Sequence, residues 1–241
     1  MKITECGESE SNYRCIAVVG GGGKTSLIFY LTRLLTEQGK KVIVAASTHM
    51  ARDKERPFAG WGDQEQLFRN LSVWGYSVVG VPEEGTGKIT CPVRADWETL
   101  RDRCDTLLVE ADGARGLPLK APADHEPVIP EPAELVIGVA GLDALDQPIP
   151  ESCHRPERVA ALLGRPLDHR ITEEDIAEIC RSERGLRKGV GERAFGIVLN
   201  KADDEGIRRR GEEIRKKIAG NRSGQWVKVM SLKNIEKDIK S

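Results

Sequence analysis

Four consecutive glycines followed by a lysine and two hydroxyl residues are the clearest chemical signal in this 241-residue chain. Consecutive glycines allow backbone turns that other residues rarely adopt, and their N–H groups can surround an anion at the start of a helix. Lys24 would then reach the β- and γ-phosphates of a nucleotide, and the Thr25 hydroxyl would bind Mg²⁺. The predicted phosphate-binding residues are Gly20, Gly21, Gly22, Gly23, Lys24, Thr25 and Ser26.

The glycine run fits a compact P-loop pattern, G-G-x-G-K-[ST], that begins at Gly20. The longer pattern, G-x-x-x-x-G-K-[ST], would need glycine at position 18, where Val18 stands, and the lysine that often precedes the compact form is replaced by Val19. Apolar residues at 15–19 and 27–35 predict the strand, turn and helix that a P-loop requires. The alternative is a glycine-rich loop that binds another anion, or none.

The second signal is Asn-Lys-Ala-Asp at positions 200–203, after another apolar run. Asp203 can accept two hydrogen bonds from guanine, whereas adenine would leave such a carboxylate unpaired. Asn200 can contact the base edge and tie loops together, and the stem of Lys201 can lie along the base. The alternative is an ordinary helix start, with Asp203 or Asp204 as its cap.

A third element follows the predicted last strand, at Ser231, Leu232 and Lys233. It resembles the serine-alanine-lysine element whose backbone contacts the guanine carbonyl in GTPases, although a serine helix cap would look the same. The glycine run, the segment 200–203 and the segment 231–233 occur along the chain in the order expected of a GTPase. The sequence therefore favours guanine over adenine.

An acidic turn, Glu110-Ala111-Asp112-Gly113, ends a predicted buried strand at 106–109. A carboxylate in this place, beside a P-loop, would hold Mg²⁺ through water. Either Glu110 or Asp112 could be the carboxylate nearer the metal. The predicted metal ligands are Thr25 and Glu110, and the predicted catalytic residues are Lys24, Glu110 and Asp112. The alternative is an acidic loop with no metal.

Four further residues are candidates for switching or partner contacts. Thr48 follows a predicted strand at 41–46 and could sense the γ-phosphate and Mg²⁺, while the adjacent His49 could touch a partner or a metal. Arg115 and Lys120 lie in a Gly/Pro-punctuated loop at 112–122 and could bind phosphate or a second anionic ligand. A structural histidine and a solvated loop are the alternatives.

Cys153 and His154 form the only adjacent soft pair among six scattered cysteines. The thiolate could carry a metal or selenium species, although a buried thiol that packs as a small apolar side chain is the simpler interpretation. The absence of C-x-x-C spacing argues against a structural zinc site or a disulfide framework.

Alternating strands and helices predict a three-layer α/β protein of the P-loop NTPase type, with a mostly parallel sheet and helices on both faces. Expected strands are at 14–19, 41–46, 73–81, 106–110, 134–140, 194–199 and 226–230, with a hairpin partner at 85–91. Expected helices are at 24–38, 97–103, 157–163, 172–181 and 204–219. Residues 1–241 would form one domain, with a small helical insertion or cover at about 141–191.

Composition excludes several classes of function. The net charge of −1, with 37 basic and 38 acidic residues, argues against general nucleic-acid binding. No apolar stretch is long enough to span a bilayer, and the first 13 residues are polar, so we expect a cytoplasmic protein without membrane contacts.

Five segments in combination resemble the YqeC family. They are the glycine run at 20–26, Ser-Thr-His-Met at 47–50, Val-Glu-Ala-Asp-Gly at 109–113 with Leu-Pro-Leu-Lys-Ala-Pro at 117–122, His-Arg-Pro-Glu-Arg-Val at 154–159 and Leu-Asn-Lys-Ala-Asp at 199–203. The resemblance extends from about residue 15 to residue 233. It implies an accessory protein for selenium-dependent molybdenum hydroxylases, with a client metalloenzyme or a cofactor-biosynthesis protein as partner.

These observations predict a Mg²⁺-dependent protein that prefers GTP to ATP and hydrolyses it slowly while acting as a maturation factor. Water would attack the γ-phosphate in line, helped by positioning and charge neutralisation. One alternative is a small-molecule phosphotransferase in which Arg115, Lys120 and His154 bind the acceptor. Another is a non-hydrolysing, nucleotide-gated carrier with Cys153, His154 or His49 at the cargo. A homodimer is compatible with each.

Overall fold

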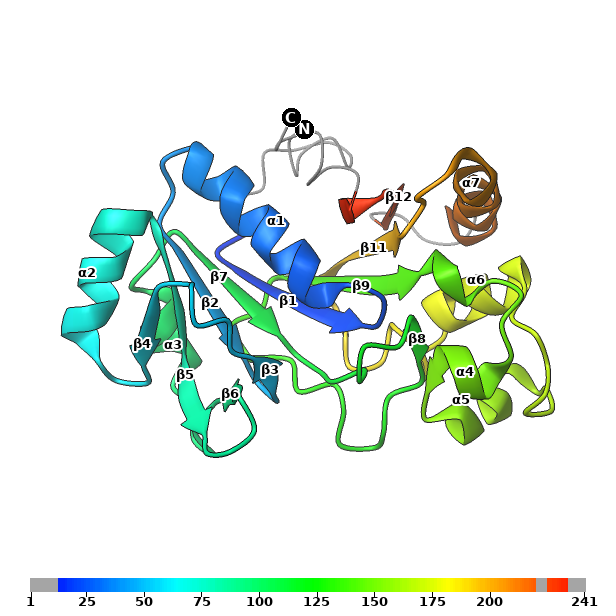
Figure 1. Cartoon of the computed structure of the whole chain (residues 1–241), viewed down its shortest axis with the longest axis horizontal. Helices are drawn as coiled ribbons and strands as arrows, with labels where there is room; N and C mark the ends of the chain where they lie inside the picture. Colours follow the sequence, from blue (N-terminus) through cyan, green and yellow to red (C-terminus); the bar gives the residue numbers. More distant parts are fainter. Residues whose placement is uncertain (1–12, 220–224, 234–241) are drawn as a thin grey trace.

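The structure is a computed structural model that describes residues 13–219 and 225–233. Its centre is a ten-stranded sheet in the order β12-β11-β9-β1-β7-β2-β5-β6-β3, with β4 paired to β5 (Figure 1). Pairing is parallel throughout except where β6 meets β5 and β3. The strands of the sheet are β1 (Cys15–Gly20), β2 (Val42–Ala46), β3 (Met50–Ala51), β4 (Phe58–Gly60), β5 (Tyr76–Glu83), β6 (Lys88–Thr90), β7 (Thr106–Glu110), β9 (Leu135–Gly141), β11 (Ala194–Asn200) and β12 (Trp226–Val229).

Helices flank this sheet, as the alternating pattern predicts. They are α1 (Lys24–Glu37), α2 (Gln64–Trp74), α3 (Trp97–Arg101), α4 (Ile149–Ser152), α5 (Pro156–Leu163), α6 (Glu173–Arg181) and α7 (Glu205–Ala219), with a 3-10 turn at Leu142–Ala144. The α/β class, with a mostly parallel central sheet between helical layers, is confirmed. No helix in the described ranges is both long and apolar enough to cross a membrane.

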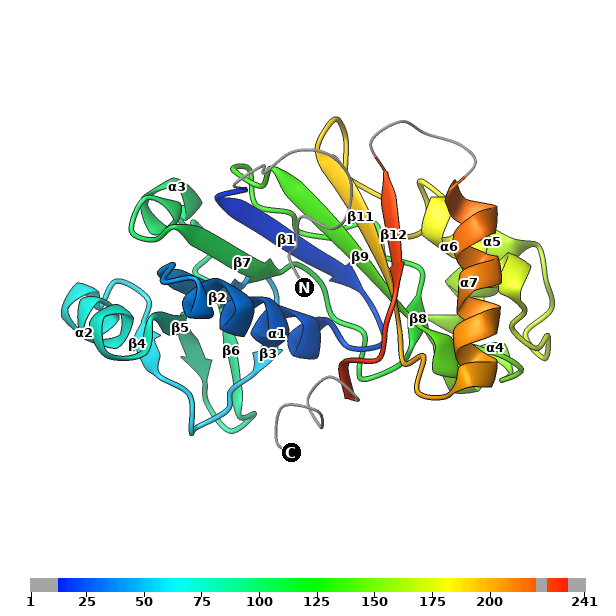
Figure 2. The same cartoon turned by 90° about the horizontal axis from the view of Figure 1, so that it is seen from above.

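The central strands are buried on both faces because their apolar side chains alternate between two cores. Val18 of β1 packs with Ile28 and Leu31 of α1 on one face. The neighbouring Val19 packs in the core on the opposite face, together with Ile176 of α6. Such continuous apolar runs are typical of parallel strands covered on both sides, which is how the sequence signalled these strands. Helix α1 lies on the Val18 face of the sheet, in contact with β7, β2 and β1, and Figure 2 shows it from above.

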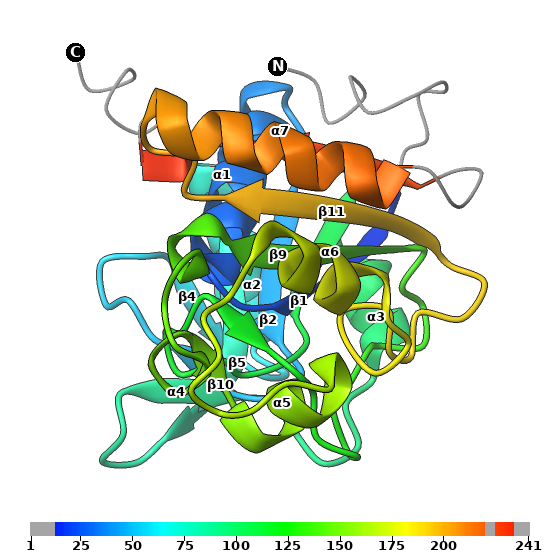
Figure 3. The same ribbon diagram turned by 90° about the vertical axis from the view of Figure 1, so that its right-hand side faces the viewer.

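Residues 142–191 form a mainly helical region beside the C-terminal half of the sheet. A second, two-stranded sheet attaches it to the loop after β7: β10 (Cys153–His154) pairs in parallel with β8 (Leu119–Lys120). On the other side, α6 packs against α7, as Figure 3 shows. The helical character expected near 141–191 is therefore present, and its role as a cover for a site stays a prediction.

The expected strand at 73–81 is partly wrong. Residues 73 and 74 are the last two of helix α2, Gly75 ends that helix with a φ of 73°, and strand β5 begins at Tyr76. Helix α2 is not among the helices expected from the sequence, although Asp63 caps it and Leu67 and Leu71 are spaced as one helical face. The exposed Val73 and Trp74 resemble strand residues in composition, so the capping signal was the better guide.

The strand order of the sheet reverses beside β1. The chain moves from β1 through α1 to β2 on one side, whereas β9 lies on the other side of β1 and leads to β11. In open parallel sheets, ligands bind outside the carboxyl ends of the strands at such a point. The glycine run and Gly141, which end β1 and β9, lie at this point.

Candidate functional site

The glycine loop after β1 needs glycine for two physical reasons. Gly20, Gly22 and Gly23 have φ values of 99°, 74° and 122°, which side-chain-bearing residues rarely adopt. There is also no room for a Cβ atom: one on Gly22 would lie 2.4 Å from the backbone nitrogen of Gly141, and one on Gly23 would lie 2.4 Å from Nδ2 of Asn200. The loop is thus pressed against the ends of β9 and β11.

The first three glycine amides are bound to protein atoms. Gly20 N–H donates to both carboxylate oxygens of Asp112, each at 3.1 Å. Gly21 N–H donates to the carbonyl of Val139 at 2.9 Å, and Gly22 N–H to the carbonyl of Leu117 at 3.0 Å. The N–H groups of residues 23–26 have no acceptor among the described residues. These four amides, at the N-terminus of α1, are the part of the loop that can receive an anion.

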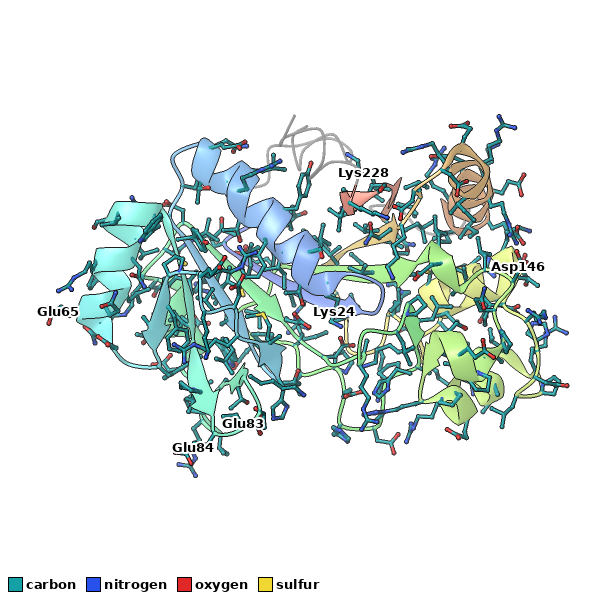
Figure 4. All side chains as sticks on the ribbon, in the orientation of Figure 1. Lys24, Glu65, Glu83, Glu84, Asp146 and Lys228 are labelled. Atoms are coloured by element: carbon teal, nitrogen blue, oxygen red, sulfur yellow. The ribbon has the colours of Figure 1, made fainter. Side chains whose placement is uncertain are left out.

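Lys24 is a buried cation between two carboxylates, at the start of α1 (Figure 4). Its Nζ donates to the Gly20 carbonyl at 2.7 Å and lies 3.3 Å from Oδ1 of Asp112 and 3.7 Å from Oε1 of Glu110. The predicted catalytic residues are therefore brought together by the parallel pairing of β1 and β7, which sets Val18 opposite Glu110.

Thr25 and Glu110, the two predicted metal ligands, contact each other. The Thr25 hydroxyl donates to Oε2 of Glu110 at 2.8 Å. Burial raises the pKa of Glu110 above its ordinary value, while the charge of Lys24 and the Thr25 hydrogen bond act in the opposite direction. A cation placed beside this carboxylate would favour its ionised form.

Asp112 is held differently from Glu110. Besides the two bonds from Gly20 N–H, it lies between Lys24 and Lys120, whose Nζ is 3.1 Å from Oδ2 of Asp112. Both of its oxygens are therefore occupied by protein donors.

Lys120 extends this network away from the glycine loop. Its side chain is fully buried, and its Nζ donates to the Gly113 carbonyl at 2.6 Å and to Oε2 of Glu126 at 3.0 Å. Glu126 also accepts from Arg155, which in turn donates to His154. A chain of alternating charges therefore runs from Lys24 through Asp112, Lys120 and Glu126 to Arg155.

The predicted base-reading residues lie beside the glycine loop. Asn200 donates from Nδ2 to the Gly22 carbonyl at 2.8 Å and accepts from the N–H of Leu232 at 3.1 Å. The Ser231 hydroxyl donates to Oδ1 of the exposed Asp203 at 2.5 Å. The structure thus joins the segment 200–203 to the segment 231–232.

Lys201 and Lys233 flank this group. Lys201 has a φ of 67°, and its Nζ lies 2.6 Å from Oδ2 of Asp143, so its stem crosses toward the end of β9. Lys233 is exposed at the end of the described chain.

Thr48 and His49 follow β2, whose end adjoins Glu110: Ser47 N–H donates to the Glu110 carbonyl at 3.0 Å. The Thr48 hydroxyl oxygen is shielded from solvent and has no hydrogen-bond partner in the described parts of the chain. Buried hydroxyls usually have a hydrogen-bond partner, so Thr48 stays a candidate for a ligand contact. His49 is exposed and pairs with Glu83 at 3.5 Å.

Cys153 and His154 form β10 and lie opposite Leu119 and Lys120, whereas Arg115 lies in the loop between β7 and β8. Arg115 is exposed, and no partner is recorded for it within the described segments. Cys153 is buried, and burial raises the pKa of its thiol to about 11, which agrees with a packed thiol rather than a metal-carrying thiolate. His154 is half-buried beside Arg155.

No cluster of three or more His, Cys, Asp or Glu side chains that could hold a metal occurs in the described residues. This does not conflict with the metal position that the sequence predicts at Thr25 and Glu110. Mg²⁺ in nucleotide sites takes most of its ligands from phosphates and water and needs only one or two protein oxygens. The hydrogen-bonded hydroxyl–carboxylate pair fits that ligand set.

Three residues of this region escaped the sequence analysis: Glu126, Arg155 and Gly141. A carboxylate partner for Lys120 could be expected in general, because a buried lysine needs an opposite charge nearby. That this partner is Glu126 depends on the fold of the loop 113–126. Arg155 was not among the predicted site residues, whereas its neighbour His154 was.

The fold and this loop together define an α/β protein in which a strand, a glycine turn and a helix present buried Lys24 to two carboxylates. A profile of the YqeC protein family matches residues 16–157. A protein of Escherichia coli (strain K12), described as uncharacterized protein YqeC, is 34% identical over 186 residues, which cover 73% of this chain and 70% of the relative. The chain therefore belongs to the YqeC family.

Proposed function

We propose that this protein binds a guanine nucleotide with Mg²⁺ at the glycine loop and hydrolyses it slowly. One observation carries the proposal: Lys24, the Thr25 hydroxyl and Glu110 converge beside four main-chain N–H groups that have no acceptor in the described residues. Cation, hydroxyl and carboxylate are the groups that a P-loop uses for phosphate and metal.

On phosphate binding, Lys24 would exchange its contacts within the protein for contacts with the ligand. Lys24 now bonds to the Gly20 carbonyl and lies near two carboxylates, all within reach of its flexible stem. A triphosphate at the N-terminus of α1 would draw the ammonium group toward the β- and γ-phosphates. The N–H groups of residues 23–26 would supply the remaining donors.

The metal position that we propose is beside Thr25 and Glu110. Glu110 has one neutral donor, Thr25, and one cation 3.7 Å away, whereas both oxygens of Asp112 are already bonded to Gly20 and approached by two lysines. Glu110 is therefore the better candidate for the carboxylate nearer the metal. Mg²⁺ at this point would supply charge neutralisation for phosphoryl transfer.

Slow turnover follows from what surrounds the loop. Among the described residues, no glutamine or arginine side chain forms a hydrogen bond with Gly20–Gly23. A partner that supplied such a group would accelerate hydrolysis.

The purine would lie between Asp203 and the Lys201 stem. Asn200 supports this position indirectly, since it bonds the glycine loop to Leu232 and so sets the distance between phosphates and base. The Ser231 bond to Oδ1 of Asp203 would orient the carboxylate that reads guanine.

The place of this reaction in the cell is proposed on the family resemblance alone. It is the cytoplasmic maturation of a selenium- or molybdenum-containing hydroxylase, with the client enzyme as partner. Co-purification of such an enzyme that depends on bound GTP would support this part, and nucleotide binding does not depend on it.

The test is a titration of the full chain with GTP, ATP and XTP, each with and without Mg²⁺. We expect GTP to bind at least about tenfold more tightly than ATP, and Mg²⁺ to strengthen binding. Asp203→Asn should shift the preference toward XTP, because the exchange inverts the hydrogen-bond demand at the base edge. Thr25→Ala should remove the Mg²⁺ effect, while Thr25→Ser should retain it.

Asp204→Asn is the matched control, since Asp204 is the exposed neighbour whose side chain caps α7 and asparagine caps equally well. It should leave the base preference unchanged. No binding of any nucleotide would refute the proposed function. Unchanged GTP preference in Asp203→Asn would refute only the base assignment.

A further inference from the structure

A second group of cations lies beyond Lys120, at the seam between the loop after β7 and the helical region. The parallel pairing of β8 with β10 sets Lys120 opposite His154. Arg155 follows His154 and reaches Glu126 on the same loop. The nucleotide site proposed above uses none of these side chains directly.

Glu126 is the acid within this group, and three donors bond to its two oxygens. Oε2 accepts from Lys120 Nζ at 3.0 Å and from Ala123 N–H at 3.2 Å, and Oε1 accepts from Arg155 Nη2 at 3.0 Å. The other carboxylate in contact with Lys120 is Asp112, which Lys24 shares. Positive charge therefore exceeds negative charge around His154.

The neutral imidazole of His154 accepts a hydrogen bond at Nε2 and can donate one from Nδ1. Arginine can only donate, so the 2.8 Å contact between Arg155 Nη1 and His154 Nε2 makes Nε2 an acceptor and leaves the ring hydrogen on Nδ1. Burial holds the pKa of His154 below its ordinary value, and the charges of Arg155, Lys120 and Arg115 lower it further, against the opposing effect of Glu126. The neutral ring thus presents one N–H group in positive surroundings.

Arg115 lies in the loop that Lys120 closes: Lys120 Nζ bonds to the carbonyl of Gly113, two residues before Arg115, and Lys120 lies opposite His154 in the β8–β10 pair. Arg115 is exposed, has no recorded partner among the described residues, and has a φ of 50°, which is costly for an arginine. The loop keeps this conformation through the bond from Leu117 N–H to the Ala114 carbonyl at 2.9 Å and the bond from Lys120 to the Gly113 carbonyl. An arginine held at this cost, without an internal partner, suits an external anion.

We propose that Arg115, His154 and Arg155 form a second anion site, which binds the phosphate group of a small molecule. The three side chains offer N–H donors, and the carboxylate beside them, Glu126, is already paired with Lys120 and Arg155, so an oxyanion rather than a cation fits. This site does not rest on the proposed nucleotide binding. It is nevertheless joined to the glycine loop, because Lys120 contacts Asp112 and Glu126 at once.

Inorganic phosphate is the probe, and the imidazole NMR signals of the full chain are the readout. The chain has four histidines, so a His154→Asn variant assigns the His154 signals directly. At constant ionic strength, phosphate should shift these signals saturably, with half-saturation in the millimolar range. Arg115→Gln should weaken the response at least about tenfold. Arg94→Gln, which alters another exposed arginine without a recorded partner, should not.

No shift of the His154 signals at tens of millimolar phosphate would overturn the proposal, and so would an equal response in Arg115→Gln and wild type. Both arginines are exposed, so these variants should fold, which circular dichroism would check. The readout is local to His154. A phosphate response in a chain that binds no nucleotide would therefore support this site while refuting the proposed function.

Discussion

Asn200 donates a hydrogen bond from its side-chain amide to the carbonyl of Gly22, at 2.8 Å, across 178 positions of the sequence. The same side chain accepts from the N–H of Leu232. One buried amide therefore bonds the end of β11 to the glycine loop and to the turn after β12. This residue links the two strongest sequence signals of the chain, whatever ligand they serve.

Replacing Asn200 should therefore destabilise the glycine loop as well as the fold. Asn200→Ala would leave the Gly22 carbonyl and the Leu232 N–H without partners, at a cost of about 3 kcal/mol in the free energy of unfolding. Urea denaturation measures this loss. Asn200→Asp keeps an acceptor for Leu232 but sets a carboxylate against the Gly22 carbonyl, so it should be no better than alanine. A fully stable Asn200→Asp variant would contradict the assigned orientation of the amide.

Gly22 should tolerate no side chain. A Cβ atom there would meet the backbone of Gly141 at 2.4 Å, in addition to the cost of a φ of 74°. Gly22→Ala should lower the free energy of unfolding by about 3 kcal/mol or more, or prevent folding. Gly39 is the matched control, because it has a φ of 78° and nothing within 4 Å of its Cβ position. Gly39→Ala should cost only about 1 kcal/mol, the conformational part.

Similar losses in the two glycine variants, measured by thermal or urea unfolding, would mean that the glycine loop is not packed as described. A stable Gly22→Ala variant would also remove the physical reason for glycine at this position.

Glu126 should make stability depend on pH in the acid range. Burial by itself would raise the pKa of Glu126, but the Lys120 hydrogen bond and charge, the Ala123 N–H and Arg155 hold it below its ordinary value of 4.5. A carboxylate with a depressed pKa stabilises the fold above its unfolded pKa, and that stability is lost as pH falls through the folded value. Glu126→Gln should therefore cost about 3 kcal/mol at pH 7, because it leaves Lys120 underpaired.

The difference between Glu126→Gln and wild type should shrink as pH falls below about 4.5, which chemical denaturation at a series of pH values would measure. Glu65→Gln is the control, since Glu65 is an exposed partner in a helix-surface pair, and it should change stability by less than about 0.5 kcal/mol. A Glu126→Gln deficit that stayed constant down to pH 3 would show that the carboxylate charge is not its cause.

Cys153 should resist thiol reagents in the folded protein. With a pKa of about 11, only about one thiol in a thousand is ionised at pH 8, and the side chain is 1% exposed. Mass spectrometry after brief alkylation should find Cys91, which is partly exposed, modified well before Cys153. Unfolding in urea should remove the difference. Rapid labelling of Cys153 in the native protein would favour its predicted role as a cargo-carrying thiolate.

Local patterns in the sequence were enough for most of the fold. Continuous apolar runs identified β1, β7, β9 and β11, since buried parallel strands need apolar side chains on both faces. Helix α6 agrees with the helix expected at 172–181, and a capping box between Thr172 and Asp175, both close in sequence, fixes its start. These features depend on neighbours in the chain, so composition and spacing reveal them. Helix α2 was not predicted, because its last two residues, Val73 and Trp74, were assigned to the strand that follows it.

The sequence also determined the chemistry of the candidate site: a glycine run, a lysine, a hydroxyl and two carboxylates, in an order that a P-loop would need. Only the tertiary structure decided that Glu110 bonds Thr25, that Asp112 is taken by Gly20 and two lysines, and that Lys120 leads through Glu126 to Arg155. The reason is that these contacts join residues up to 92 positions apart. Strand order, register and loop path set such distances, and no local pattern of residue types encodes them.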